Sequence, residues 1–171
     1  IYTRNDSLGI LFSWVTSGTY ALTTTQQGDL SANVPTGWTT DNWGTARLNW
    51  LRGDPGNEGT GSDNFRERTD GFKLGDIVNS TPIFVGAPPY LADIDSGTHT
   101  TFRTNYTTRT EMIYVGANDG MLHGFDASTG QEKIAYLPSM VFSSSGNLNK
   151  LTSASYVHQY YVDGSPTVGD A

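Results

Sequence analysis

Residues 112–137 constrain the fold more than any other part of the sequence. Three short runs rich in β-branched and aromatic residues are separated by Asn118-Asp119-Gly120 and by residues 126–130; the runs are Met112–Ala117, Met121–Phe125 and Lys133–Leu137. Glycine and small polar residues at the two separations are typical of tight turns, because they tolerate a positive φ. The alternation of strand and turn predicts an antiparallel meander, which supplies three of the four strands of one propeller blade.

The fourth strand of this blade is predicted at Ile77–Val85, with Pro82 near its start, where a strand tolerates proline. We expect the strands 77–85, 112–117, 121–125 and 133–137 to form one antiparallel sheet in that spatial order. A faint repeat supports a blade architecture, because Ser80–Gly86 is echoed by Gly164–Gly169. Val162 onward is therefore expected to begin the next blade.

A single blade cannot bury both of its faces, and a closed propeller needs about four to eight blades. The sequence therefore predicts an all-β fold that is a fragment of a β-propeller. We expect about one complete four-stranded blade, parts of neighbouring blades, a short helix and long loops. Residues 1–73 are expected to lead into the propeller, and residues 74–171 to hold the blade and the start of the next.

The segment before the blade has its own signals. Tyr2 and Leu8–Val15 predict a hairpin around residues 5–7, followed by a loop that reaches residue 30. We expect the strand Leu8–Val15 to pair with a strand outside the chain or to lie at an exposed sheet edge. A helix is predicted over Asn42–Arg52, with Asp41 as N-cap and Gly53 as the first residue beyond its end.

Composition excludes several classes of function. The 171 residues include no cysteine, which excludes thiol catalysis and thiolate metal sites. The net charge of −7, without a basic stripe, argues against a nucleic-acid partner. No run approaches the roughly 20 apolar residues that span a bilayer. His99, His123 and His158 are too dispersed to predict an acid–base pair, so we expect a protein without catalysis and without a cofactor in these residues.

One tripeptide suggests receptor binding. Arg52-Gly53-Asp54 is the sequence that integrins read, in which a guanidinium and a carboxylate are held apart by glycine and the acid reaches a metal on the receptor. The alternative interpretation is structural: Arg52 ends the helix, Gly53 caps it and Asp54 precedes a proline.

Other candidate residues have structural alternatives as well. Asp93 and Asp95, and the acids of 54–63, are weak candidates for calcium, because neither group has the ligand spacing of a calcium loop. Asp119 and Asp126 are expected to bond backbone amides in the two turns. His123 is expected to be a packed core histidine. The four tryptophans are expected to pack in the core or anchor loops rather than stack on sugars; they are Trp14, Trp38, Trp43 and Trp50.

Three stretches together resemble the carboxy-terminal domain of the PilC/PilY family of type IV pilus biogenesis and tip-adhesin proteins. They are Leu48–Asp54 followed by Phe65–Arg68, Leu74–Pro82 with Val85-Gly86, and Tyr114–Asp126 extended by Tyr161–Ala171. Their order and spacing match from about residue 44 to the end. The resemblance implies a β-propeller at the bacterial cell surface, outer-membrane associated or at the pilus tip, that acts in pilus extension, adhesion and twitching motility.

The same resemblance implies partners: minor pilins of the pilus tip complex, a host or surface receptor, and the remainder of the protein's own propeller. The family also carries a calcium loop of alternating Asp and Asn, which these residues lack, so calcium is expected only in the full-length protein. Two other functions remain open. One is a quinoprotein-type dehydrogenase propeller, which shares part of the Tyr114–Asp126 motif, and the other is a general interaction scaffold.

Overall fold

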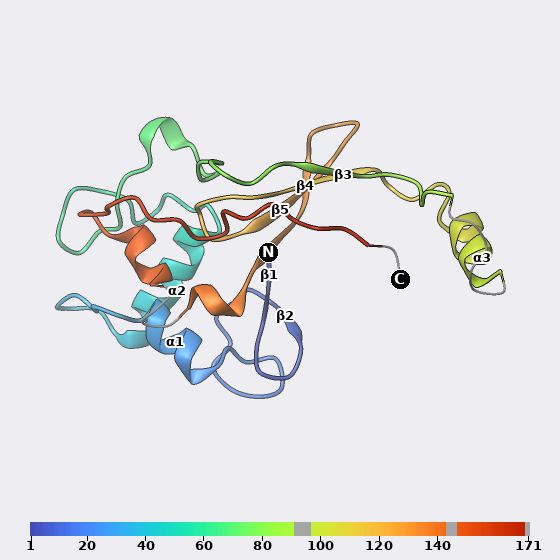
Figure 1. The fold of residues 1–171 in the computed structure, drawn as a ribbon. Coiled ribbons are helices and arrows are strands. Elements are labelled where there is room, and N and C mark those ends of the chain that lie inside the picture. Colours follow the sequence, from blue (N-terminus) through green and yellow to red (C-terminus); the bar gives the residue numbers. More distant parts are fainter. Residues whose placement is uncertain (91–96, 143–146, 170–171) are drawn as a thin grey trace.

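The structure, a computed structural model, describes residues 1–90, 97–142 and 147–169. Its centre is a six-stranded sheet with the strand order β2-β1-β6-β5-β4-β3 (Figure 1). The strands are β1 (Tyr2–Arg4), β2 (Gly9–Leu11), β3 (Ile83–Val85), β4 (Met112–Gly116), β5 (Leu122–Asp126) and β6 (Glu132–Leu137). The helices are α1 (Thr24–Leu30), α2 (Thr40–Leu51) and α3 (Thr98–Asn105), with short 3₁₀ helices at Thr69–Gly71, Ser139–Val141 and Leu148–Thr152.

The predicted blade is confirmed. Strands β3, β4, β5 and β6 are neighbours in that order, and each pair is antiparallel. The first strand is shorter than expected, because β3 covers only Ile83–Val85. The backbone N–H groups of Asn79 and Thr81 donate to the side chains of Asp163 and Ser165, so they are not available for a ladder with β4.

The amino-terminal hairpin is also confirmed, although its second strand is limited to Gly9–Leu11. This strand pairs with β1 and lies at the edge of the sheet, which is one of the two positions expected for it. The sequence did not predict that β1 would pair in parallel with β6. The buried Thr3 hydroxyl supports this pairing by donating to the Leu137 carbonyl at 2.8 Å.

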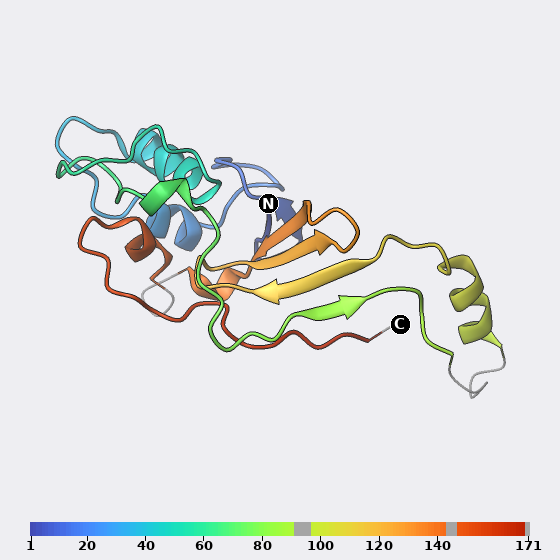
Figure 2. The same cartoon turned by 90° about the horizontal axis from the view of Figure 1, so that it is seen from above.

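The helices required three corrections. Thr39 rather than Asp41 is the N-cap of α2, and its side chain accepts from the Asn42 amide. Helix α1 occupies part of the expected loop; its signal was the capping box in which Thr23 and Gln26 bond each other's backbone N–H groups. Helix α3 was missed, because none of its residues is buried and it therefore lacks an apolar face. It lies at the far end of the excursion between β3 and β4 (Figures 1 and 2).

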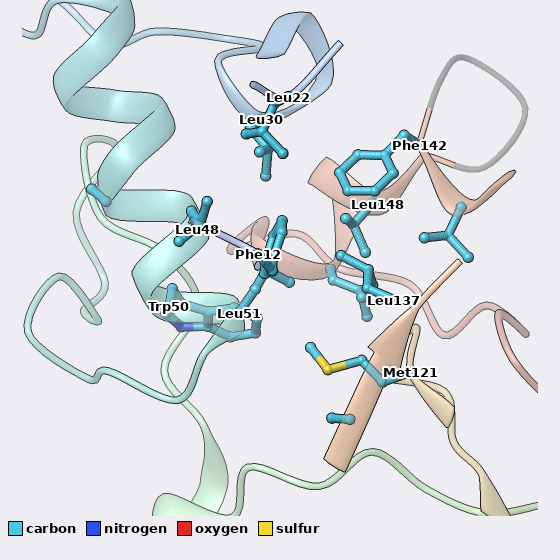
Figure 3. Close-up of a cluster of buried hydrophobic side chains, with 14 of the residues drawn as sticks. Phe12, Leu22, Leu30, Leu48, Trp50, Leu51, Met121, Leu137, Phe142 and Leu148 are labelled. Atoms are coloured by element: carbon cyan, nitrogen blue, oxygen red, sulfur yellow. The ribbon is translucent and has the colours of Figure 1, made fainter. Parts of the chain in front are cut away.

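The hydrophobic core joins the helical half of the chain to β6, the last strand of the blade. Figure 3 shows the cluster between α2 and the end of β6. Its fully or nearly fully buried members come from residues 10–65 and from residues 121–151; those labelled are Phe12, Leu22, Leu30, Leu48, Trp50, Leu51, Met121, Leu137, Phe142 and Leu148. Among the described residues, no helix combines the length and the apolar character that crossing a membrane requires.

One buried cation links the helices to each other. Arg47 on α2 donates to the carbonyl groups of Asp29 and Leu30 and, through Nε, to the Thr152 hydroxyl at 3.0 Å. These two carbonyls belong to the end of α1, where a helix leaves carbonyl groups without helical partners. Burial lowers the pKa of Arg47 to about 10, so the guanidinium remains charged at neutral pH.

The carboxy-terminal segment lies beside the start of the blade (Figure 2). The bonds from Asn79 to Asp163 and from Thr81 to Ser165 place these segments side by side in parallel, at the offset of the sequence repeat. The expected next strand is not formed within residues 147–169. Instead the segment crosses β4 so closely that a Cβ on Gly116 would clash with the Val162 carbonyl.

This close approach gives the first prediction. Gly116→Ala should lower the free energy of unfolding by about 1–3 kcal/mol, because the added methyl group overpacks a backbone contact. Thermal denaturation measures the loss, and hydrogen exchange at the Asn79 and Thr81 amides measures detachment of the carboxy-terminal segment. Gly164→Ala is the control, since nothing lies within 4 Å of its Cβ position. Equal stability of the two variants would contradict the prediction.

Candidate functional site

Residues from two of the stretches that carry the family resemblance, Leu74–Pro82 and Tyr114–Asp126 with its extension from Tyr161, meet at one place together with His158. We call this place the motif junction: Gly75, Asp76, Asn118, Asp119, His158 and Tyr161. The Gly75 amide donates to Asp119 Oδ2 at 2.9 Å, and the Asn118 amide donates to the Asp76 carbonyl at 3.0 Å. A Cβ on Gly75 would clash with the Asp119 amide. The segment before β3 therefore lies directly on the turn between β4 and β5.

Side chains extend the junction to the carboxy-terminal segment. Asp76 Oδ2 accepts from Asn118 Nδ2 at 2.9 Å and bonds His158 Nε2 at 2.8 Å. Burial raises the pKa of the Asp76 carboxyl group, but the bonds from Asn118 and His158 outweigh it and hold this pKa below its usual value. Asn118 Oδ1 accepts from the Tyr161 amide at 3.0 Å. Asn118 therefore connects three separate parts of the chain.

A histidine between two acids lies beside the junction. His123 on β5 is 5% exposed; its Nδ1 is 2.6 Å from Glu132 Oε1 and its Nε2 is 3.0 Å from Asp119 Oδ2. Burial lowers the pKa of His123, but the hydrogen bonds and charges of Asp119 and Glu132 outweigh it, so the net shift is upward. The expectation of a buried histidine is confirmed, but the side chain is ion-paired rather than packed among apolar groups.

A cleft of about 240 Å³ opens between α2 and the motif junction. Arg66, Arg68 and Lys73 contribute its cationic side chains, and Asp76 and Asp119 contribute its acids. Arg68 is fully engaged by the protein: it pairs with Glu58 and donates to the carbonyls of Trp50 and Asp54. Sequence reasoning missed this cleft, because its cations precede the blade while its acids lie before β3 and in the β4–β5 turn.

Arg52-Gly53-Asp54 forms the end of helix α2. The Gly53 amide donates to the Trp50 carbonyl and the Asp54 amide to the Asn49 carbonyl, the two bonds of a Schellman motif. Gly53 has a φ of +100°, as its predicted position beyond the helix requires. Arg52 and Asp54 are exposed, although Arg52 Nη1 donates to the Phe12 carbonyl and Asp54 Oδ1 accepts from the Gly56 amide.

The structure describes only one of the two calcium candidates, the acids of residues 54–63. Asp93 and Asp95 lie outside the described residues. In the second candidate segment, the Glu58 carboxylate is already paired with Arg68. Over residues 1–90, 97–142 and 147–169, no group of three His, Cys, Asp or Glu side chains has the geometry to hold a metal ion.

The remaining candidates have structural roles. Asp119 Oδ1 accepts from the Met121 amide, and Asp126 Oδ1 accepts from the Ser128 and Thr129 amides, as turn residues do. Trp43 and Trp50 are 4% exposed, and Trp14 and Trp38 pack against the core. His99 and His158 have other bonding partners than His123: His99 bonds the Pro89 carbonyl and His158 bonds Asp76.

Comparisons with known proteins find matches to the part of the chain that holds these motifs. The family model described as PilY1 beta-propeller domain matches residues 74–171. The chain is 45% identical over 159 residues to type IV pilus biogenesis factor PilY1 of Pseudomonas aeruginosa strain PAK, which covers 88% of this chain and 13% of that protein. It is 42% identical over 129 residues to a PilY1 homolog of Xylella fastidiosa strain Temecula1, covering 72% of this chain and 10% of that protein. No solved structure matches the chain.

The buried histidine predicts a pH dependence of stability. Because the pKa of His123 is raised on folding, its stabilising contribution is complete below its ordinary value of 6.5 and is lost as pH rises through the raised pKa. The difference in unfolding free energy between the wild type and His123→Gln should therefore shrink as pH rises from 6 to about 9. Urea denaturation across this range measures it. Leu137→Val, a core change without a titrating group, should cost the same at every pH; a constant difference for His123→Gln would contradict the prediction.

Proposed function

The chain belongs to the PilY1 family, and from this premise we propose that it is a propeller part of a type IV pilus biogenesis factor and acts without catalysis. The chain spans about an eighth of the length of the curated relatives it matches (13%), so the activity of a whole protein is proposed rather than assigned. The observation that carries the proposal is the motif junction. Its polar groups bond one another, as a scaffold requires, instead of pointing together at a substrate position.

The chemistry of His123 supports a non-enzymatic role. Both of its ring nitrogens are engaged by carboxylates, and the side chain is almost fully buried. A general base needs a nitrogen within reach of a substrate proton, and neither nitrogen of His123 has this freedom. Among the described residues, the hydrogen bonds of the imidazole go to carboxylates and not to a hydroxyl group.

The finer parts of the proposal concern place and partners. We propose a location at the bacterial cell surface, with minor pilins of the pilus tip and the remainder of the protein's own propeller as partners, and roles in tip adhesion and twitching motility. Calcium is proposed only for parts of the full-length protein beyond these residues. A visible absorption spectrum separates this proposal from a quinoprotein-type dehydrogenase, because a bound quinone absorbs and a pilus scaffold does not.

A chimera tests the proposed function. The matching segment of Pseudomonas aeruginosa PilY1 would be replaced by this chain, and surface pili would be counted by electron microscopy. We expect the chimera to support pili, and Gly75→Val in the chimera to abolish them because it separates the motif junction. Gly164→Val is the matched control, since its Cβ position is open. A stable, surface-located chimera without pili would refute the proposal.

Receptor binding through Arg52-Gly53-Asp54 is a second candidate function, favoured by the exposure of Arg52 and Asp54. If the tripeptide is an integrin ligand, Asp54→Glu should weaken binding, because one added methylene moves the carboxylate away from the receptor metal. If it is only a helix cap, Asp54→Glu should change little. Gly53→Ala should then lower stability by about 1 kcal/mol through the positive φ.

Both variants would be scored for integrin binding by surface plasmon resonance and for stability by thermal denaturation. Binding that is unchanged in Asp54→Glu, or absent in the wild type, would leave the tripeptide with its structural role alone.

A further inference from the structure

Arg66 lines the cleft between α2 and the motif junction, and only one of its guanidinium nitrogens has a hydrogen-bond acceptor among the described residues. Its Nε donates to the Leu151 carbonyl, and its guanidinium carbon lies 5.2 Å from the Trp50 ring centroid and 4.6 Å from that of Tyr156. The backbone bond and the two rings fix the plane of the guanidinium. The Nη1 and Nη2 groups have no protein acceptor among the described residues, and Arg66 lines the cleft.

Arg66 also has no ion-pair partner among the described residues. Its basic neighbour Arg68 pairs with the carboxylate of Glu58, and no carboxylate of the described residues lies within ion-pair distance of Arg66. Burial lowers the pKa of Arg66 and the charge of Arg68 adds to this effect, while Tyr156, Glu58 and Tyr161 oppose it without cancelling it. Arg66 is therefore a half-buried cation with a fixed orientation and no ion-pair partner among the described residues, in a chain whose net charge is −7.

The other charges of the cleft decide which anion fits. Lys73 is exposed at the wall and adds a second cation. The Asp119 carboxylate bonds His123 and the Gly75 amide, and the Asp76 carboxylate bonds Asn118 and His158. Both acids therefore already have hydrogen-bond partners in the protein. These acids oppose a dianion more strongly than a monoanion. A planar carboxylate matches the two parallel donors of the Nη edge.

We propose that this cleft is a carboxylate-binding site in which Arg66 holds a ligand carboxylate end-on through Nη1 and Nη2, with Trp50 and Tyr156 as the aromatic walls that orient the guanidinium. The ligand carboxylate belongs to an acidic side chain of a polypeptide or to a small free acid, because the chemistry at Arg66 is the same for both. The site is independent of the proposed role in pilus biogenesis.

An NMR titration of the 171-residue chain tests this site. The Trp50 indole N–H donates to the Arg66 carbonyl at 3.2 Å, so its signal reports on this position. Acetyl-glutamate methylamide should shift the signal saturably, whereas the neutral acetyl-glutamine methylamide should not. Butyrate, a free acid with a single charge, is titrated in parallel; tighter binding of butyrate than of the glutamate probe identifies a free acid as the source, and the reverse identifies an acidic side chain.

Arg66→Lys keeps the charge but removes the two-pronged donor edge, so it should weaken binding of the glutamate probe roughly fivefold or more. Arg103→Lys is the matched control, because Arg103 lies over the Tyr90 ring at 5.7 Å on the distant α3 excursion. Thermal denaturation establishes that each variant is folded; if Arg66→Lys is not, the comparison of the two probes on the wild type decides. No saturable shift with either acid, or equal binding by folded Arg66→Lys, would overturn the proposal.

Discussion

The contact between the segment before β3 and the β4–β5 turn is the constraint on which the rest of the structure depends. The Gly75 amide reaches Asp119, and the Asp76 carbonyl accepts from the Asn118 amide. Each bond contributes only about 1 kcal/mol, but together they fix where the first strand of the blade begins. The same turn then receives Tyr161 through Asn118 and His158 through Asp76. Glycine is required at position 75 because any side chain would displace the backbone from the turn.

The blade is stabilised differently on its two sides. The last strand of the blade, β6, contacts the helical half of the chain through the shared core, where Leu137 is fully buried. It also pairs in parallel with β1. On the other side, β3 is an edge strand, and apolar side chains in β3 and in the segment before it remain exposed; they are Ile77, Val78 and Phe84. A propeller blade has apolar groups on both faces that only neighbouring blades cover. This asymmetry is what a fragment of a propeller should show.

The parts of the fold that were predictable from the sequence are those determined by local chemistry. The turns at 118–120 and 126–130 have the residues that tight turns demand, so the order of β3 to β6 followed from them. Gly53 ends α2 for the same kind of reason. The parallel pairing of Tyr2 with Tyr136 and the cleft at Arg66 could not be predicted, because they join residues that are far apart in sequence and depend on how the helical half packs on β6.

The acid pair around His123 shows why a site can depend on one irregularity. In β5 and β6, Gly124 pairs with Ile134, and a regular antiparallel register would then place Phe125 opposite Lys133. The bulge between Gly124 and Phe125 instead places Phe125 opposite Glu132. Residues 123 and 125 point to the same face of the strand, so this shift brings a carboxylate rather than an ammonium group to the His123 ring. A cation there would lower the pKa of His123, whereas the bulge adds Glu132 to Asp119 as a second acid that raises it.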